Sequence, residues 1–223
     1  KLGVRIKEQG NFYCFSKNEL KGAEIVLPEF SVTATEVLLL ASVLACGKTI
    51  IKVAATEPHV YDLILALREM GCDIRGEGTH TLEIMGVNSA KGFIRDVIPD
   101  YIEGGTFVIM ALATCSYIKV KNIVPWHLDI FFEKLKEMGA VLEIGENGVE
   151  VLPSPDLKAI RVQALPFPGF PTDLLPLIVP LLTQAQGKSL IHDPLYENRL
   201  NYVQELRKMG ADIEIVDPHR AFV

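Results

Sequence analysis

Apolar residues along this chain fall into short blocks that repeat in a fixed order. Residues 36–46 (EVLLLASVLAC) are apolar at nearly every position, which predicts a helix buried on most sides, and Gly47 is expected to end it. Residues 49–53 (TIIKV) follow as a strand, and residues 58–71 form a helix with a single apolar face. Two short strands close the block, at 72–75 and 81–85.

The same order of elements returns twice. Three segments end in nearly the same phrase, LREMGCDI, LKEMGAVL and LRKMGADI, beginning at Leu67, Leu135 and Leu206. Their glycines are 68 and 71 residues apart, which is too long for the common solenoid repeats. Each copy must therefore be a small supersecondary unit in its own right.

The second and third copies repeat this pattern of elements. The second predicts helices at 105–114 and 126–138 and strands at 118–121, around 141–144 and around 149–152. The third predicts a helix from Asp173, a strand at 189–192, a helix at 197–209 and a strand at 212–216. We expect no partner strand after 216. That expectation, together with a first residue, Lys1, that is not Met, predicts a fragment of a longer protein.

In every copy the first helix is apolar nearly all round, whereas the second has a charged face. A helix without a polar face has to be buried on most sides. The sequence therefore predicts an α/β fold made of βαβαββ units, with helices inside and sheets outside.

Composition narrows the class of protein. Of 223 residues, 49% are hydrophobic and 22% charged, as in ordinary folded domains, and the net charge of −6 gives no overall field that attracts nucleic acid or an anionic membrane. The four cysteines lie far apart, as reduced thiols of a cytoplasmic protein do, and the five histidines lack metal-ligand spacing. We expect no metal, no membrane span and no nucleic-acid partner. The oligomeric state stays open.

The strongest candidates for chemistry are loops that lead into helices. Residues 165–173 (LPFPGFPTD) form a stiff, proline-rich loop that delivers Thr172 and Asp173 to a helix start. A carboxylate there is ordinarily a helix cap, but a rigid approach also suits a general base. In the loop 193–199, Arg199 beside Tyr196 is suited to clamp a phosphate or carboxylate. Both interpretations stay open for these residues.

Two weaker candidates precede the apolar helices. Residues 98–106 contain the pair Gly104 and Gly105, which would let backbone amides approach an anion, although the segment matches no P-loop or dinucleotide fingerprint. Residues 31–36 carry hydroxyls that cap the following helix or contact a ligand. Capping alone would explain them.

Several ordered motifs together resemble the enolpyruvyl transferases that act on UDP-N-acetylglucosamine. They are FSVTATE at 30–36, AATEP at 54–58, PDYIEGGTF at 99–107, PGFPTD at 168–173 and YENR at 196–199. The resemblance implies an inside-out α/β barrel with two domains of three units each and the ligands between them. About three of the six units would be present. Residues 1–98 would be the last unit of one domain, and residues 99–223 the first two units of the other.

The resemblance also implies a reaction and roles for residues. The reaction is transfer of the enolpyruvyl group of phosphoenolpyruvate to the 3-hydroxyl of UDP-N-acetylglucosamine, which opens peptidoglycan precursor synthesis and needs no cofactor. Asp173 would be the base that takes the hydroxyl proton. The substrate-binding residues would be Glu29, Phe30, Ser31, Val32, Thr172, Leu195 and Arg199, with Glu57, Asp100, Glu103 and Tyr196 as cleft residues. The family's cysteine proton donor would lie before Lys1.

Three positions depart from the family pattern. Glu29 stands where the family often has Lys, Thr33 where it often has Gly, and His59 where it often has Glu. An acidic Glu29 beside a diphosphate is unfavourable, which makes the nucleotide assignment weaker than that of Asp173. Two alternatives remain open at this point: the related shikimate-pathway transferase, and a non-catalytic module that binds a UDP-sugar.

Overall fold

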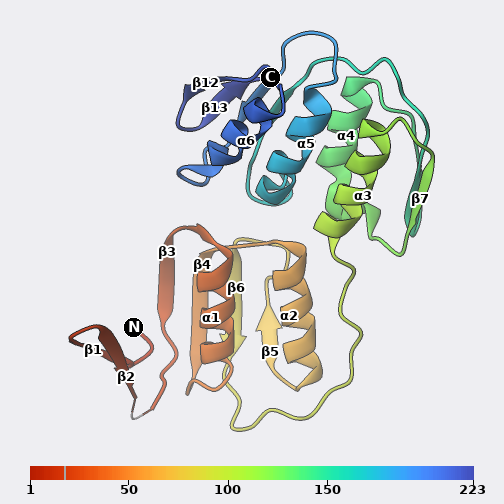
Figure 1. Ribbon diagram of the computed structural model, residues 1–223. Helices are drawn as coiled ribbons and strands as arrows, with labels where there is room; N and C mark the ends of the chain where they lie inside the picture. Colours follow the sequence, from red (N-terminus) through yellow and green to blue (C-terminus); the bar gives the residue numbers. More distant parts are fainter. Residues whose placement is uncertain (18) are drawn as a thin grey trace. The chain divides into compact units, whose positions relative to one another are not determined.

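The computed structural model describes residues 1–17 and 19–223 (Figure 1). These residues form two compact units, Lys1–Ile98 and Pro99–Val223, each with its own hydrophobic core. Both units combine helices and sheets, so the α/β class expected from the sequence is confirmed.

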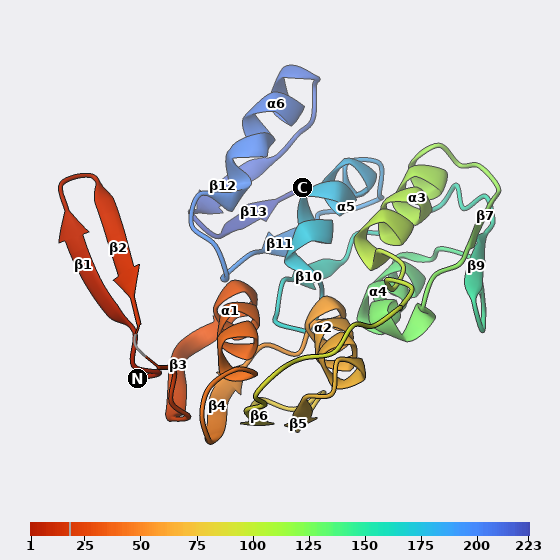
Figure 2. The ribbon, with the colours of Figure 1, turned by 90° about the horizontal axis from the view of Figure 1, so that it is seen from below.

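The first unit contains a hairpin and a four-stranded sheet with two helices. The hairpin extends away from the rest of the unit (Figure 2). In chain order the elements are β1 (Arg5–Gln9), β2 (Phe12–Ser16), β3 (Glu24–Ser31), α1 (Val32–Ser42), β4 (Lys48–Ala54), α2 (Pro58–Glu69), β5 (Asp73–Arg75) and β6 (Thr81–Met85).

The second unit contains two sheets, three longer helices and a short one. Its first half holds α3 (Tyr101–Ala113), β7 (Ile118–Lys121), the 3₁₀ helix η1 (Pro125–Leu128), α4 (Asp129–Met138), β8 (Leu142–Gly145) and β9 (Gly148–Val151). Its second half holds β10 (Arg161–Gln163), η2 (Thr172–Leu174), α5 (Leu175–Leu182), β11 (Leu190–His192), η3 (Arg199–Tyr202), α6 (Val203–Lys208), β12 (Glu214–Asp217) and β13 (Arg220–Phe222).

The sheets show that the sequence repeat is also a repeat of topology. Two sheets have the same strand order, β3-β4-β6-β5 and β10-β11-β13-β12. In each, the first two strands are parallel and the other pairs are antiparallel. The sheet of the middle copy has the order β7-β9-β8 and, within the described residues, no counterpart of the first strand.

One expectation about the last copy was wrong. Strand β12 does have a partner, because β13 pairs with it and with β11. Only three residues make up β13, and they follow a tight turn in which the backbone N–H of His219 bonds to the Asp217 carboxylate at 2.9 Å. A run this short lies below the length at which alternation identifies a strand.

The three repeated glycines end their helices in the same way. Gly71, Gly139 and Gly210 have φ of +93°, +95° and +96°, the left-handed region that glycine adopts without steric cost. The residue after each glycine donates its backbone N–H to the leucine carbonyl five positions earlier, at 2.9 to 3.1 Å. The phrase shared by the three copies therefore encodes a Schellman cap that turns the chain back toward the sheet.

Helix α1 starts four residues before the apolar segment 36–46 that predicted it. Helix α1 begins at Val32, because the Ser31 hydroxyl accepts the N–H of Ala34 at 3.3 Å, and it ends at Ser42, before Gly47. The expectation of burial on most sides was wrong for α1 within this chain, since Val37 and Leu40 are 59% and 53% exposed. For α5 that expectation is confirmed, as five of its eight residues are buried.

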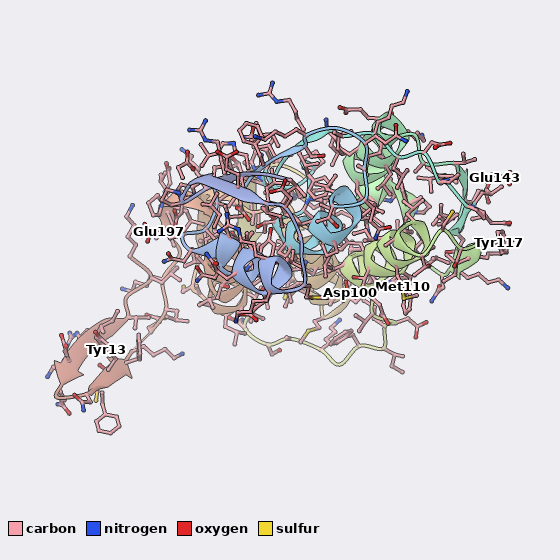
Figure 3. The ribbon with its side chains drawn as sticks, turned by 45° about the horizontal axis from the view of Figure 1, so that its top comes forward. Tyr13, Asp100, Met110, Tyr117, Glu143 and Glu197 are labelled. Atoms are coloured by element: carbon pink, nitrogen blue, oxygen red, sulfur yellow. The ribbon has the colours of Figure 1, made fainter. Side chains whose placement is uncertain are left out.

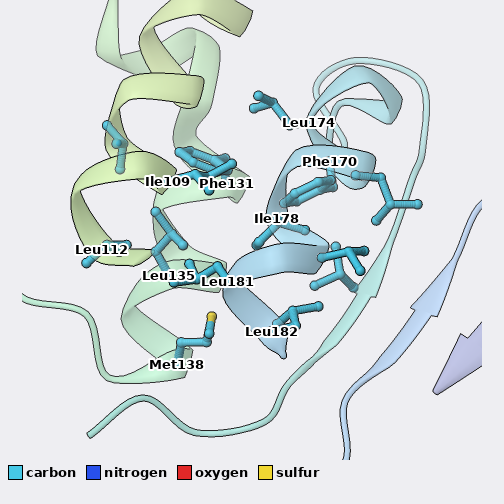
Figure 4. Packing of buried hydrophobic residues seen from close by; sticks show 14 of the residues in the cluster. Ile109, Leu112, Phe131, Leu135, Met138, Phe170, Leu174, Ile178, Leu181 and Leu182 are labelled. Atoms are coloured by element: carbon cyan, nitrogen blue, oxygen red, sulfur yellow. The ribbon is translucent and has the colours of Figure 1, made fainter. Parts of the chain in front are cut away.

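The core of the second unit lies among α3, α4 and α5. Figure 4 shows Ile109 from α3, Phe131 and Leu135 from α4, and Ile178 and Leu181 from α5 gathered between the three helices. Removing such side chains from water supplies the main driving force for folding. This core carries the loop from which Asp173 projects.

Candidate functional site

The proline-rich loop is anchored at both ends. At its start, Ala164 donates its N–H to the carbonyl of His192 at 2.9 Å, and Leu165 donates to the carbonyl of Phe170 at 3.1 Å. At its end, the Phe170 ring is buried and lies 6.0 Å from the ring of Phe131 in the core. Through these contacts the chain reaches Asp173 from a fixed position. The Phe167–Pro168 peptide bond is cis.

The side chain of Asp173 does not cap a helix. The 3₁₀ turn Thr172–Leu174 is preceded by Pro171 and receives no side-chain cap, so capping as the role of this carboxylate was wrong. The Asp173 carboxylate instead forms an ion pair with the guanidinium of Arg199. The Asp173 side chain is 62% exposed and that of Arg199 33%. The carboxylate is thus open to a ligand and held on one side by a cation.

Arg199 stands in the loop after β11, at the start of η3. Asn198 precedes it with a left-handed φ of +56°, a conformation that asparagine tolerates better than most residues. The Arg199 guanidinium lies 5.2 Å from the centre of the Tyr196 ring, close enough for a cation–π contact. Glu197 is in the same loop (Figure 3). The structure brings Asp173, Tyr196 and Arg199 together, as a shared site requires.

Asp193 is a residue of this site that the sequence did not reveal. Its side chain is fully buried and accepts two hydrogen bonds, one from the Thr172 hydroxyl at 2.7 Å and one from the backbone N–H of Leu195 at 3.1 Å. The only signal in the sequence was an Asp-Pro pair directly after an apolar strand, which is common in turns. Thr172 and Leu195 are therefore joined through one carboxylate.

Two buried polar atoms lie beside the ion pair. Within the described part of the chain, the Tyr202 hydroxyl and Arg199 Nε have no hydrogen-bond partner. Burial raises the pKa of Tyr202, the charge of Asp193 adds to that rise, and Arg199 opposes it. Since unpaired buried polar groups are costly, these atoms mark a place where a ligand or water gains hydrogen bonds.

His127 packs beside the proline-rich loop. Its ring is buried, with centroids 4.2 Å from Trp126, 6.2 Å from Tyr101 and 6.5 Å from Phe167, all edge-on. Burial lowers the pKa of His127, which keeps the imidazole neutral. The proline-rich loop therefore packs, through Phe167, against an uncharged imidazole ring.

In the first unit, the segment that ends β3 is built as a turn into α1. Glu29 and Phe30 are exposed, and the Phe30 ring lies 4.5 Å from that of His80. Ser31 caps α1 through its hydroxyl, and Val32 is the first helical residue. Ser31 thus serves as the cap that the sequence predicted, and the neighbouring side chains remain open to a ligand.

The hydroxyl of Thr35 ties this turn to the end of β4. It donates to the Ser31 carbonyl at 2.7 Å and accepts the N–H of Ala55 at 3.0 Å, and the side chain is fully buried. Nearby, Glu57 precedes α2 without capping it, and its Oε2 is buried with no partner among the described residues.

The remaining candidates lie at the start of α3 (Figure 3). The Asp100 carboxylate accepts the N–H groups of Ile102 and Glu103 at 2.8 and 3.3 Å, so it caps the helix. Asp100 and Glu103 also line a hollow of about 440 Å³ with Lys119 and Lys121.

The two glycines of α3 do not form an anion site. Gly104 and Gly105 are buried inside the helix, where a Cβ would lie 2.8 Å from Ile123 and from Leu174 respectively. They allow close packing, so the idea that their amides approach an anion was wrong.

Comparison with known proteins identifies the fold and the family. A family model described as EPSP synthase (3-phosphoshikimate 1-carboxyvinyltransferase) matches residues 1–220. The chain belongs to this family of enolpyruvyl transferases.

Within the family, several curated relatives share one name. The UDP-N-acetylglucosamine 1-carboxyvinyltransferase 1 of Carboxydothermus hydrogenoformans is 44% identical over 96% of this chain and 51% of its own length. The corresponding enzyme of Halothermothrix orenii is 44% identical over 100% and 53%, and that of Parasynechococcus marenigrum 47% over 90% and 46%. The chain spans about half the length of the curated relatives that it matches.

Solved structures show the same fold. The enolpyruvyl transferase NikO from Streptomyces tendae has a TM-score of 0.88 at 21% identity, covering 100% of this chain and 55% of that one. An EPSP synthase from Acinetobacter baumannii has a TM-score of 0.70 at 21% identity, covering 99% and 53%. No helix among the described residues combines the length and hydropathy needed to cross a membrane.

Proposed function

We propose that the complete protein carrying this chain transfers the enolpyruvyl group of phosphoenolpyruvate to the 3-hydroxyl of UDP-N-acetylglucosamine and releases phosphate. The observation that supports it most strongly is the identity of 44–47% to transferases named for that sugar nucleotide, over nearly the whole chain. The reaction would place the protein at the start of peptidoglycan precursor synthesis, in the cytoplasm, without a cofactor.

Asp173 is the proposed general base. Its carboxylate is exposed, held on a loop anchored by Phe170, and oriented by Arg199. A base in a fixed position removes the hydroxyl proton as the oxygen attacks C2 of phosphoenolpyruvate, and positioning of this kind contributes much of a catalyst's rate. Arg199 is the proposed contact for the anionic substrate, since its planar fork suits phosphate and carboxylate oxygens.

The proposed nucleotide contacts are Glu29, Phe30, Ser31 and Val32 in the first unit and Leu195 and Thr172 in the second. Phe30 offers an exposed aromatic ring, and the N–H groups at the start of α1 favour a diphosphate. The Glu29 carboxylate opposes that anion, so it is expected to weaken nucleotide binding. Glu57 in the first unit and Asp100, Glu103 and Tyr196 in the second are proposed as further cleft residues.

We also propose the finer architecture of the family for the complete protein, an inside-out α/β barrel of six units. Residues 1–98 would be the last unit of one domain, and residues 99–223 the first two of the other. The repeated strand order supports this, as do the apolar side chains of α1 left exposed in this chain, which further units would cover.

A phosphate-release assay on the complete reading frame tests the proposal. We expect phosphate from phosphoenolpyruvate with UDP-N-acetylglucosamine and none with shikimate 3-phosphate. Turnover with shikimate 3-phosphate alone would favour the related transferase, and binding of the UDP-sugar without turnover would favour a binding module. We expect the 223-residue chain alone to be inactive, because it spans about half the length of the curated relatives.

A further inference from the structure

The three repeats share one backbone hydrogen bond, at the ends of β4, β7 and β11. There, one residue donates its backbone N–H to the carbonyl of the residue just before the last strand. The pairs are Ala54 with His80 at 3.1 Å, Asn122 with Asn147 at 2.9 Å and Asp193 with His219 at 2.8 Å. Since alanine serves in the first copy, the fold needs only the backbone at this position.

The likeness between the first and third copies is closer still. His80 Nδ1 lies 2.9 Å from the Ala54 carbonyl oxygen, and His219 Nδ1 lies 2.8 Å from that of Asp193. The two turns therefore match in backbone and in side-chain contact, although one position holds a methyl group and the other a carboxylate. Neither contact uses the Asp193 side chain, so that side chain serves something other than the repeat.

The Asp193 carboxylate is costly to bury and has specific partners. A charged group at 0% exposure loses its hydration, and only directed hydrogen bonds offset that loss. One Asp193 oxygen accepts the Thr172 hydroxyl at 2.7 Å, and the other accepts the Leu195 N–H at 3.1 Å. Thr172 precedes Asp173 directly, and Leu195 lies in the loop that leads to Arg199.

We propose that Asp193 is a positioning residue that fixes the Asp173 carboxylate relative to Arg199 by holding Thr172 and Leu195 at once. The inference rests on the proposed function, because it assigns Asp173 and Arg199 to the reaction. Asp193 is fully buried rather than open to a ligand. It acts through the two segments that it joins, and misplacement of a catalytic group by about 1 Å can cost about 100-fold in rate.

The test compares two substitutions in the complete protein. Asp193→Ala removes both hydrogen bonds. Asp193→Asn keeps them, because the amide NH₂ donates to the Thr172 hydroxyl oxygen and the amide oxygen accepts the Leu195 N–H. We expect Asp193→Ala to lower kcat about 30- to 100-fold. We expect Asp193→Asn to keep a kcat at least about tenfold higher than that of the alanine variant.

Amide hydrogen exchange supplies a measurement that does not depend on activity. We expect peptides spanning 193–199 to exchange faster in Asp193→Ala than in the wild type, and close to the wild-type rate in Asp193→Asn. Ser154→Ala is the matched control, since Ser154 is also buried and also joins two backbone segments, through Val141 N and the Leu152 carbonyl. It should leave both kcat and the exchange of 193–199 unchanged.

Each result has a defined meaning. A kcat for Asp193→Ala within threefold of the wild type overturns the inference, and so does an asparagine variant as slow as the alanine variant. If Asp193→Ala does not fold, Thr172→Val compared with Thr172→Ser replaces it, with kcat restored by serine as the supporting result. A wild type without turnover overturns the proposed function instead, and the exchange comparison still decides whether Asp193 holds the loop.

Discussion

Asp173 and Arg199, which are 26 positions apart in the chain, form an ion pair that joins the turn after the proline-rich loop to the loop after β11. Each was assigned to the site for a different reason, one as a base and the other as an anion contact. Their pairing places the proposed base and the proposed anion contact on one surface of the second unit. If Arg199 binds the anionic substrate as proposed, that substrate competes with Asp173 for the same guanidinium.

The first prediction concerns the Asp173 carboxylate. In the complete protein, Asp173→Asn should lower kcat by about 100-fold or more, because the amide cannot accept the hydroxyl proton. The KM for UDP-N-acetylglucosamine should change far less, since the substitution preserves size and polarity. Steady-state phosphate release measures both constants. The exposed acid Asp156 is the matched control, and Asp156→Asn should leave kcat unchanged; an Asp173→Asn variant as active as this control would remove Asp173 from the reaction.

The sequence predicted the parts of this site that lie in recognisable loops. Asp173 follows a proline-rich segment and Arg199 a segment of charged and aromatic residues, and both segments can be recognised from the sequence alone. Asp193 was not predicted, because its proposed role depends on its contacts with Thr172 and Leu195. Both these contacts and the burial of its carboxylate depend on tertiary structure. The position of Asp193 matches that of Ala54 in the first copy, so the repeat pattern alone assigned it no function.

The repeat in the sequence predicted most of the helices and strands, but it missed the start of α1 and the last strand, β13. The helix ends at or before Gly71, Gly139 and Gly210 could be predicted because glycine and the spacing of apolar residues act locally. The start of α1 was not, since the hydroxyl of Ser31 outweighed the weak helix propensity of Val32 and Thr33. Strand β13 pairs with β12 across a tight turn and with β11, which is distant in the sequence, and no local pattern encodes the pairing with β11.

The second prediction concerns close packing at Gly105. Alanine in an exposed helix gains about 1 kcal/mol over glycine, but here its Cβ would lie 2.8 Å from a methyl of Leu174, whose side chain is fully enclosed. Overpacking of this kind costs about 1–3 kcal/mol, so Gly105→Ala should lower the free energy of unfolding. It should also lower kcat, because Leu174 adjoins Asp173. Urea unfolding and phosphate release measure the two effects.

Gly92 supplies the control for this experiment. Its Cβ would meet no atom within 4 Å, so Gly92→Ala should change neither stability nor kcat. If Gly105→Ala is as stable as the wild type, α3 and the turn at Leu174 are less tightly packed than the structure has them.

The third prediction is a pH dependence due to His127. Burial lowers the pKa of His127, so below the ordinary value of about 6.5 the unfolded chain binds more protons than the folded one. The stability that the neutral imidazole contributes is complete above that pH and is lost as pH falls toward the folded-state pKa. His127→Phe should therefore lose less stability than the wild type between pH 7.5 and pH 5.

Urea unfolding of the complete protein across that pH range provides the test. His59→Phe, which replaces an exposed histidine, should follow the wild-type profile. Parallel profiles for His127→Phe and the wild type would mean that the His127 ring is reached by water in the folded protein.

The last prediction concerns the charge at Glu29. If the segment 29–32 holds the diphosphate, Glu29→Lys replaces a repulsion by an attraction. In a solvent-exposed setting the total change is about 1 kcal/mol, which lowers the KM for UDP-N-acetylglucosamine about fivefold. The gain should shrink at about 1 M salt, where charges more than about 3 Å apart are screened. Glu8→Lys makes the same change of net charge on the exposed strand β1, so it separates a local effect from an overall one. Equal KM values for the two variants would place the diphosphate away from Glu29, and a lower KM in Glu29→Lys alone would support this turn as the nucleotide contact.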